Sequence, residues 1–216
     1  MAAFFFHGDL SALLRRKWRR ENPVILHINR AASIKDVIES CGLPHTEIGR
    51  IERQGSEVDF SFPVADSHRF DIHPLKAPCD LTRPTLLTPR PIDSVRFLVD
   101  ANVGRLARYL RMAGVDTFYD RALDDQGIVE LLERDRRILL TRDMGLLKRK
   151  TVVHGRYVRA EDPAEQLREI LAFYGLTKQV KPFTLCLDCN APLHFIDKEK
   201  VRSRLEPLTE RYYHTF

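Results

Sequence analysis

Two aspartates in the second half of the chain follow short apolar runs, and these positions are typical of ligand-binding residues. Asp100 ends the stretch FLVD, and Asp143 ends the stretch ILLTRD. Ligands of open parallel sheets bind at the carboxyl ends of the strands, so we expect the two carboxylates to lie close together. A third acid, Asp124 or Asp125, stands at the predicted start of a helix. Mg²⁺ and Mn²⁺ prefer oxygen ligands, so the pattern predicts a divalent-metal site that activates water for attack at phosphorus.

A row of arginines follows the first of these aspartates. Arg105, Arg108 and Arg111 recur every three residues on a predicted helix and spread over about 120° of its surface. Guanidinium groups bind phosphate in a bidentate manner, so a row of this kind beside an acidic pocket suits a phosphodiester backbone. Arg142, next to the second aspartate, is expected to contact phosphate as well.

Each of these features also has a purely structural interpretation. An Asp after a strand commonly caps a turn or a helix, and a row of arginines can be a solvated helix face. Asn102 and Thr141 stand beside the two strand-end acids, where they either orient ligands and water or are ordinary turn residues. The coincidence of two strand-end acids with a third acid nearby favours the catalytic interpretation.

Alternating strands and helices are expected to position these side chains. Hydrophobic periodicity predicts a parallel sheet with helices on both faces. The expected strands are 95–99, 115–120, 138–140 and 156–158, and the expected helices are 104–113, 124–135 and 163–174.

The first part of the chain has a different order of elements. We expect a β-grasp module of α+β class, with one helix over 33–42. Its expected strands are 2–7, 24–29, 48–53, 58–62 and 69–73. Four prolines in residues 76–94 predict an extended, stiff connection between the two parts. The predicted organisation is a module at 1–75, a linker at 76–94, an α/β domain at 95–176 and a final segment at 177–216.

Composition and charge limit the classes of function. No apolar run approaches the roughly 18–20 residues that span a bilayer, and no basic segment precedes the N-terminal phenylalanines, so we expect a cytoplasmic location and no membrane partner. Lys plus Arg minus Asp plus Glu is 10 − 10 for residues 1–75, 3 − 2 for 76–94, 15 − 13 for 95–176 and 7 − 5 for 177–216. The excess positive charge therefore lies after residue 75, which is compatible with a nucleic-acid partner.

The segments FLVDANVGRLARYLRMAGVDTFYD and RRILLTRDMGLL resemble the Mut-seven C-terminal ribonuclease domain, a branch of the PIN-like metal-dependent nucleases. The resemblance runs over about 96–174 and continues into the cysteine region. The segments GRIERQGSEVDFSF and FDIHPL resemble the ubiquitin-like module that bacterial members carry ahead of it. The resemblance implies a PIN-like α/β fold, ribonuclease activity and a metal site built from Asp100, Asp124 and Asp143. Sulfur transfer is not expected, because the module lacks a free C-terminal Gly-Gly.

Cys186 and Cys189 form a CLDC pair, which in the family is the first half of a zinc ribbon. Two thiolates cannot complete a tetrahedral zinc site. Either further ligands follow the sequence given, or His194 or His214 completes the site. Cys41 and Cys79 are interpreted as structural residues.

The function predicted from these features is a Mg²⁺- or Mn²⁺-dependent ribonuclease acting on RNA. The alternative is a non-catalytic RNA- or ribosome-binding adaptor that uses the basic face. In either case the ubiquitin-like module is expected to contact a protein partner or the substrate.

Overall fold

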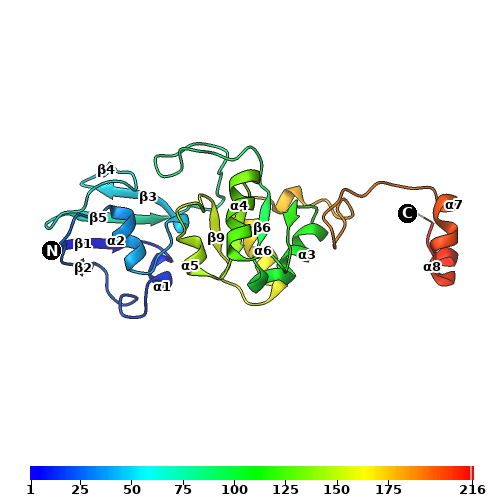
Figure 1. Cartoon of the computed structure of the whole chain (residues 1–216), viewed down its shortest axis with the longest axis horizontal. Helices are drawn as coiled ribbons and strands as arrows, with labels where there is room; N and C mark the ends of the chain where they lie inside the picture. The colour runs from blue at the N-terminus through cyan, green and yellow to red at the C-terminus, as the bar shows by residue number, and fades with distance from the viewer. Residues whose placement is uncertain (215) are drawn as a thin grey trace.

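The computed structural model describes residues 1–214 and 216, which form two sheets joined by a long connection (Figure 1). A five-stranded sheet in the order β2-β1-β5-β3-β4 comes first, and a four-stranded sheet in the order β7-β6-β8-β9 follows. Among the described residues, no helix has the length and apolar character needed to cross a membrane. The predicted α+β module and α/β domain are both confirmed.

The five-stranded sheet is mixed, as in a β-grasp fold. β1 (Ala2–Phe6) pairs in parallel with β5 (Arg69–Pro74) and antiparallel with β2 (Val24–Leu26). β3 (Ile48–Arg53) pairs antiparallel with β5 and with β4 (Ser56–Glu57). The alternate buried residues of β1 share one core with α2 (Ile34–Ser40), which begins with a capping box at Ser33.

Two expectations for this module need correction. The strand predicted over 58–62 is absent, because Asp59 Oδ1 accepts hydrogen bonds from the N–H and the hydroxyl of Ser61 at 2.8 and 2.6 Å. Such a local turn competes with the pairing of strands. A short helix that was not predicted, α1 (Leu10–Leu13), follows β1.

The four-stranded sheet is parallel throughout and covered by helices on both faces. Alternate side chains of each strand point to opposite faces. Phe97 and Val99 of β6 (Phe97–Val99) therefore share a core with α3 (Gly104–Met112) and α6 (Pro163–Phe173). Leu98 packs with α4 (Asp125–Asp135) and α5 (Met144–Leu147). The other strands are β7 (Thr117–Phe118), β8 (Ile138–Thr141) and β9 (Gly155–Tyr157), and the short 3-10 helices are η1 (His45–Glu47), η2 (Ala101–Val103) and η3 (Thr177–Gln179).

The connection over 76–94 contains no helix or strand, as expected, but it packs against both sheets. The Cys79 N–H donates a hydrogen bond to the Phe173 carbonyl oxygen at 2.7 Å, and Leu87 joins the core of the first module. The last part of the chain forms α7 (Lys198–Val201), η4 (Arg202–Arg204) and α8 (Pro207–Tyr212). Figure 1 shows α7 and α8 apart from the two sheets, at the end of an extended stretch.

A buried ion-pair cluster joins the two modules. Glu47 of η1 is fully buried, and its carboxylate accepts hydrogen bonds from Arg156 at 2.8 Å, from Arg159 at 2.9 Å and from the Tyr157 N–H at 2.7 Å. Burial acts to lower the pKa of Arg159, but the adjacent Glu47 carboxylate raises it above its ordinary value. The ubiquitin-like module is therefore attached to β9 by specific charged contacts.

Candidate functional site

Asp100 and Thr141 lie side by side where β6 and β8 end. Val99 pairs with Leu140, so the next residue of each strand is a neighbour across the edge of the sheet. Asp100 Oδ2 accepts hydrogen bonds from the Thr141 hydroxyl and from the Asn102 side-chain amide, both at 2.6 Å. Thr141 is fully buried. Its hydroxyl therefore fixes the orientation of the carboxylate from inside the protein.

Asp143 follows two residues later and is exposed. Its Oδ1 accepts hydrogen bonds from the backbone N–H groups of Gly145 at 2.6 Å and Leu146 at 3.1 Å, which cap α5. Its own N–H donates to Thr141 Oγ1 at 2.9 Å. Thr141 is thus shared between Asp143 and Asp100 and links the two acids.

Asp124 caps α4, where its Oδ1 accepts a hydrogen bond from the Gly127 N–H at 2.8 Å. Asp100, Asp124 and Asp143 have one feature in common: one carboxylate oxygen of each is hydrogen-bonded, and the other has no such partner among the described residues. The described part of the chain contains no cluster of three or more His, Cys, Asp or Glu side chains arranged to hold a metal. The three-acid metal site therefore stays a prediction.

A cavity of about 400 Å³ opens at the same edge of the sheet; Ala101 and Asn102, which follow Asp100, line it, whereas Asp100, Asp124 and Asp143 do not. Arg105 of α3 and Arg121, which follows β7, contribute its cationic lining. Tyr119 forms part of the wall and lies against Gly104, where a Cβ atom would come within 2.5 Å of the tyrosine hydroxyl. The sequence reasoning missed Arg121 and Tyr119. The available signal was their position after a third parallel strand, whose carboxyl end opens on this edge.

The structure divides the predicted arginine row. Arg105 and Arg108 of α3 are exposed to solvent. Arg142, which follows β8, is half-buried; it donates a hydrogen bond to the Ala160 carbonyl oxygen at 3.0 Å and forms an ion pair with Glu161 at 3.5 Å. Arg105 and Arg108 lie on the helix that follows β6, and Arg142 is the residue after β8. All three therefore follow the carboxyl ends of these two strands in the sequence.

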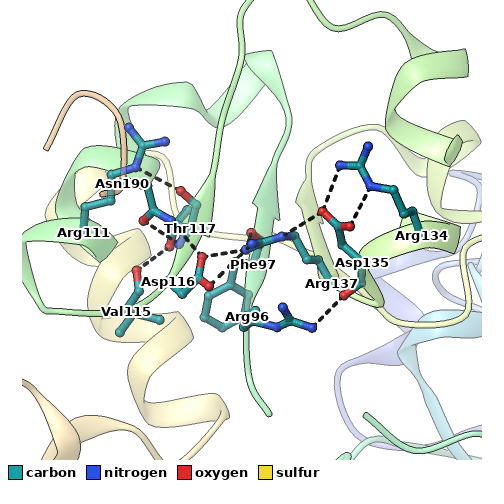
Figure 2. Close-up of polar contacts among 10 residues, drawn as sticks. All are labelled: Arg96, Phe97, Arg111, Val115, Asp116, Thr117, Arg134, Asp135, Arg137 and Asn190. Atoms are coloured by element: carbon teal, nitrogen blue, oxygen red, sulfur yellow. Dashed lines mark hydrogen bonds and ion pairs between the residues drawn. The ribbon is translucent and has the colours of Figure 1, made fainter. Parts of the chain in front are cut away.

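Arg111 is not part of this surface, so the prediction that it binds RNA phosphate is wrong. Its side chain is only 4% exposed, and it donates hydrogen bonds to the carbonyl oxygens of Leu187 and Asp188 at 3.0 and 2.8 Å. A third bond, to the Thr117 carbonyl oxygen at 2.9 Å, is drawn in Figure 2. Burial lowers the pKa of Arg111. The helical rotation explains its placement, since Arg111 lies only about 40° from the buried Ala107.

Comparison with known proteins gives two matches to family models. The Mut7-C ubiquitin model matches residues 1–80, and the Mut7-C RNAse domain model matches residues 95–216, which is more than half of the chain. The chain belongs to the Mut7-C RNAse domain family. No curated protein and no solved structure matches it. The resemblance stated for 96–174 is confirmed, and the family match continues through the cysteine pair into α8.

The Mut7-C segment that contains the cysteine pair is attached to the edge strand β7. Asn190 Oδ1 accepts a hydrogen bond from the Thr117 N–H at 3.0 Å, and Asn190 Nδ2 donates to Asp116 at 2.8 Å. Figure 2 shows Asp116 between Asn190 and Arg137. Asp116 forms an ion pair with Arg137 at 2.7 Å. Burial acts to raise the pKa of Asp116, but the hydrogen bonds from Arg137 and Asn190 lower it below its ordinary value.

The cysteine pair itself has a backbone suited to a thiolate. The N–H groups of Cys189 and Asp188 donate hydrogen bonds that lower the pKa of Cys186, and the thiolate is the form that binds metal. Within residues 1–214 and 216, no third His, Cys, Asp or Glu side chain joins the pair. Neither His194 nor His214 therefore completes a zinc site here, and two thiolates do not close one.

The other two cysteines are buried. Cys41 lies in the core of the ubiquitin-like module, and Cys79 lies in the core beneath α3 and α6. Burial raises the pKa of both thiols, that of Cys79 to about 11. A protonated thiol in an apolar core packs as a small hydrophobic side chain.

Proposed function

We propose that this Mut7-C protein is a metal-dependent ribonuclease that hydrolyses RNA phosphodiester bonds at the carboxyl ends of β6 and β8. The supporting observation is the pairing of these strands, which links Asp100 and Asp143 through Thr141 and leaves one oxygen of each carboxylate open. The family to which the chain belongs supports RNA as the substrate class. The available donors are hard oxygen atoms, which suit Mg²⁺ or Mn²⁺.

In this proposal, Asp100 and Asp143 hold the cation, and Asp124 completes the acidic set. A bound divalent cation supplies Lewis-acid polarisation of the phosphoryl group and an activated water. Thr141 and Asn102 hold Asp100 in one orientation, so its open oxygen needs little reorganisation to bind a ligand. The backbone N–H groups at the start of α5 do the same for Asp143.

The cationic side chains of this edge are assigned to the phosphates of the RNA strand. Arg105 lines the cavity at the edge of the sheet, Arg108 stands one helical turn further on, and Arg142 follows β8 directly. Arg121 joins them in this assignment because it lines the same cavity. Guanidinium groups offer paired donors that match phosphate oxygens.

The test is to measure cleavage of end-labelled single-stranded RNA with Mg²⁺, with Mn²⁺ and with a chelator present, together with calorimetric titration of each metal. We expect metal-dependent cleavage and metal binding that weakens in Asp100→Asn. Asp59→Asn serves as the matched control, because Asp59 is an exposed acid whose Oδ1 accepts a backbone N–H, from Ser61, but it lies in the first module. A protein that binds RNA but neither binds the metals nor cleaves would instead be the non-catalytic adaptor.

A further inference from the structure

A concentrated run of positive charge follows α1 in the ubiquitin-like module. Residues 15–20 read RRKWRR and contain half of the ten Lys and Arg residues found in residues 1–75. All five cationic side chains are exposed, and none forms an ion pair with a described residue. Two nearby acids of the module have other partners, since Asp9 pairs with Arg159 and Glu39 with His45, and Glu21, which follows the run, forms no ion pair with a described residue.

This run has a defined conformation. The Trp18 side chain packs against the core of the module, and Lys17 Nζ lies 4.4 Å from the centre of its ring. The Trp18 N–H donates to the Arg15 carbonyl oxygen at 2.8 Å, and the Arg15 N–H donates to the Cys41 carbonyl oxygen at 2.8 Å. The protein therefore holds the backbone of the run in place, and the Lys17 and Arg19 side chains have contacts of their own, which reduces the entropy lost when a ligand binds.

Two contacts place the run on the side of the molecule that contains the proposed active site. Asp9, which precedes α1, pairs at 2.8 Å with Arg159, which follows β9 at the carboxyl edge of the sheet. Met144, the residue after Asp143 and the first of α5, packs against the core that includes α1. Figure 1 shows α5 on the side of its domain that faces the first sheet.

Cations gathered without acidic partners repel one another, and a polyanion removes that repulsion. We propose that residues 15–20 bind the sugar–phosphate backbone of the RNA strand as it leaves the carboxyl edge of β6 and β8. The inference rests on the proposed function for the course of the strand. It assigns substrate binding to the ubiquitin-like module. The module's overall neutrality conceals this role, because its other charges balance the run.

The experiment measures the affinity of the full chain for single-stranded RNA at several salt concentrations, in a chelator so that no cleavage occurs. One variant combines Arg16→Gln, Lys17→Gln and Arg20→Gln, which leaves Arg15 and Arg19 with their backbone contacts. The matched control removes the same charge from three other exposed cations that have no ion pair with a described residue, by Arg30→Gln, Arg168→Gln and Lys178→Gln. A charge-preserving variant combines Arg16→Lys and Arg20→Lys.

If the three side chains contact phosphates, their removal flattens the slope of log K against log salt by about 2, since each contact to a single strand contributes about 0.7. Two proteins that bind equally near 1 M salt then differ about 100-fold near 0.1 M. The charge-preserving variant and the matched control should keep the original slope. An unchanged slope in the triple variant, or an equal loss in the matched control, would overturn the inference.

The same proteins separate this inference from the proposed function. A chain that binds RNA through residues 15–20 but cleaves none in Mg²⁺ or Mn²⁺ would contradict the proposed function and leave the binding assignment intact. A chain that cleaves RNA and keeps its salt slope without these charges would overturn the binding assignment alone. In that case, a protein partner would be the remaining role for the basic run.

Discussion

Carboxylates lie near arginines in two regions of this molecule, and the two regions differ in burial and in how many carboxylate oxygens are hydrogen-bonded. At the junction of the modules, Glu47 is fully buried, and Arg156, Arg159 and a backbone N–H occupy its oxygens. At the carboxyl edge of β6 and β8, Asp143 is exposed and Asp100 is half-buried, and each keeps one oxygen without a hydrogen bond to a described residue. The same residue types thus make a rigid joint in one place and a surface open to ligands in the other.

The comparison indicates which charges can be removed without loss of the fold. A buried charge whose partner is removed remains unsolvated, which is costly. An exposed carboxylate can lose its negative charge, and with it the ability to bind a cation, while its neighbours stay solvated. Substitutions at the Glu47 junction should therefore reduce stability, and substitutions at the carboxyl edge of β6 and β8 should reduce activity without unfolding the protein.

The largest effect is expected at the junction. Glu47→Gln leaves Arg156 and Arg159 without their shared carboxylate, and loss of one member of a buried ion pair costs about 3–5 kcal/mol. The free energy of unfolding in urea measures this loss. Glu57→Gln is the control, because Glu57 is exposed and lies 4.0 Å from its one partner, Arg50; it should change stability by less than about 0.5 kcal/mol. Equal stability of the two variants would contradict the structural role of Glu47.

The next effect is catalytic. Asp143→Asn retains an oxygen that can cap α5 but removes the anion, so cleavage of RNA should fall by at least about 100-fold while the unfolding free energy changes little. Single-turnover cleavage and urea denaturation of the same preparation measure the two quantities. Cleavage at the original rate would place the metal site elsewhere in the protein.

Two arginines on α3 provide the same contrast between a buried and an exposed charge within one helix. Arg111→Ala removes hydrogen bonds to three carbonyl oxygens and should cost about 1–3 kcal/mol of stability. Arg108→Ala should leave stability within about 0.5 kcal/mol and flatten the salt dependence of RNA binding by about 0.7. Thermal unfolding and binding at several salt concentrations test both variants, and a reversal of the two effects would contradict the assignment of the helix faces.

The smallest effect concerns pH. His154 is buried with its Nε2 3.0 Å from the Arg90 carbonyl oxygen, and burial, assisted by Arg136, lowers its pKa below the ordinary 6.5. The unfolded chain therefore binds a proton at a higher pH than the folded chain, so stability should decline as pH falls below 6.5. His154→Asn should reduce this decline, measured as unfolding free energy against pH. An identical profile in the variant would assign the decline to other groups.

Much of the α/β domain could be predicted because buried parallel strands are short apolar runs whose ends are marked by polar residues. Asp100 and Thr141 are neighbours because the pairing of β6 with β8 determines their register, whereas the convergence of the Asp100 and Asp143 carboxylates stays a prediction. The burial of Arg111 could have been anticipated only from the helical rotation relative to Ala107, together with the position of a segment about 75 residues away. Spacing of three residues is not enough to keep a whole row on one face.

Other features depend on contacts that sequence patterns do not reveal. Glu47 and its arginine partners are separated by 109 and 112 residues, and each is an ordinary surface residue by type. The basic run at 15–20 is not apparent from the net charge of residues 1–75, because ten acids there balance ten Lys and Arg residues. The strand expected over 58–62 is replaced by a turn, because the Asp59 side chain accepts a local hydrogen bond. A single turn-forming side chain is harder to recognise in a sequence than an alternating strand pattern, but it directs the backbone equally well.

The two outer strands of the four-stranded sheet have a consequence for association with other chains. β7 and β9 are the edge strands, and an outward-facing N–H of an edge strand can pair with a further strand. Asn190 accepts the Thr117 N–H at one edge, and Glu47 accepts the Tyr157 N–H at the other. Side chains from outside the sheet thus take the place of peptide groups from a fifth strand. Recruitment of a partner peptide by strand addition, and edge-to-edge aggregation by the same route, would first have to displace the CLDC segment or the ubiquitin-like module.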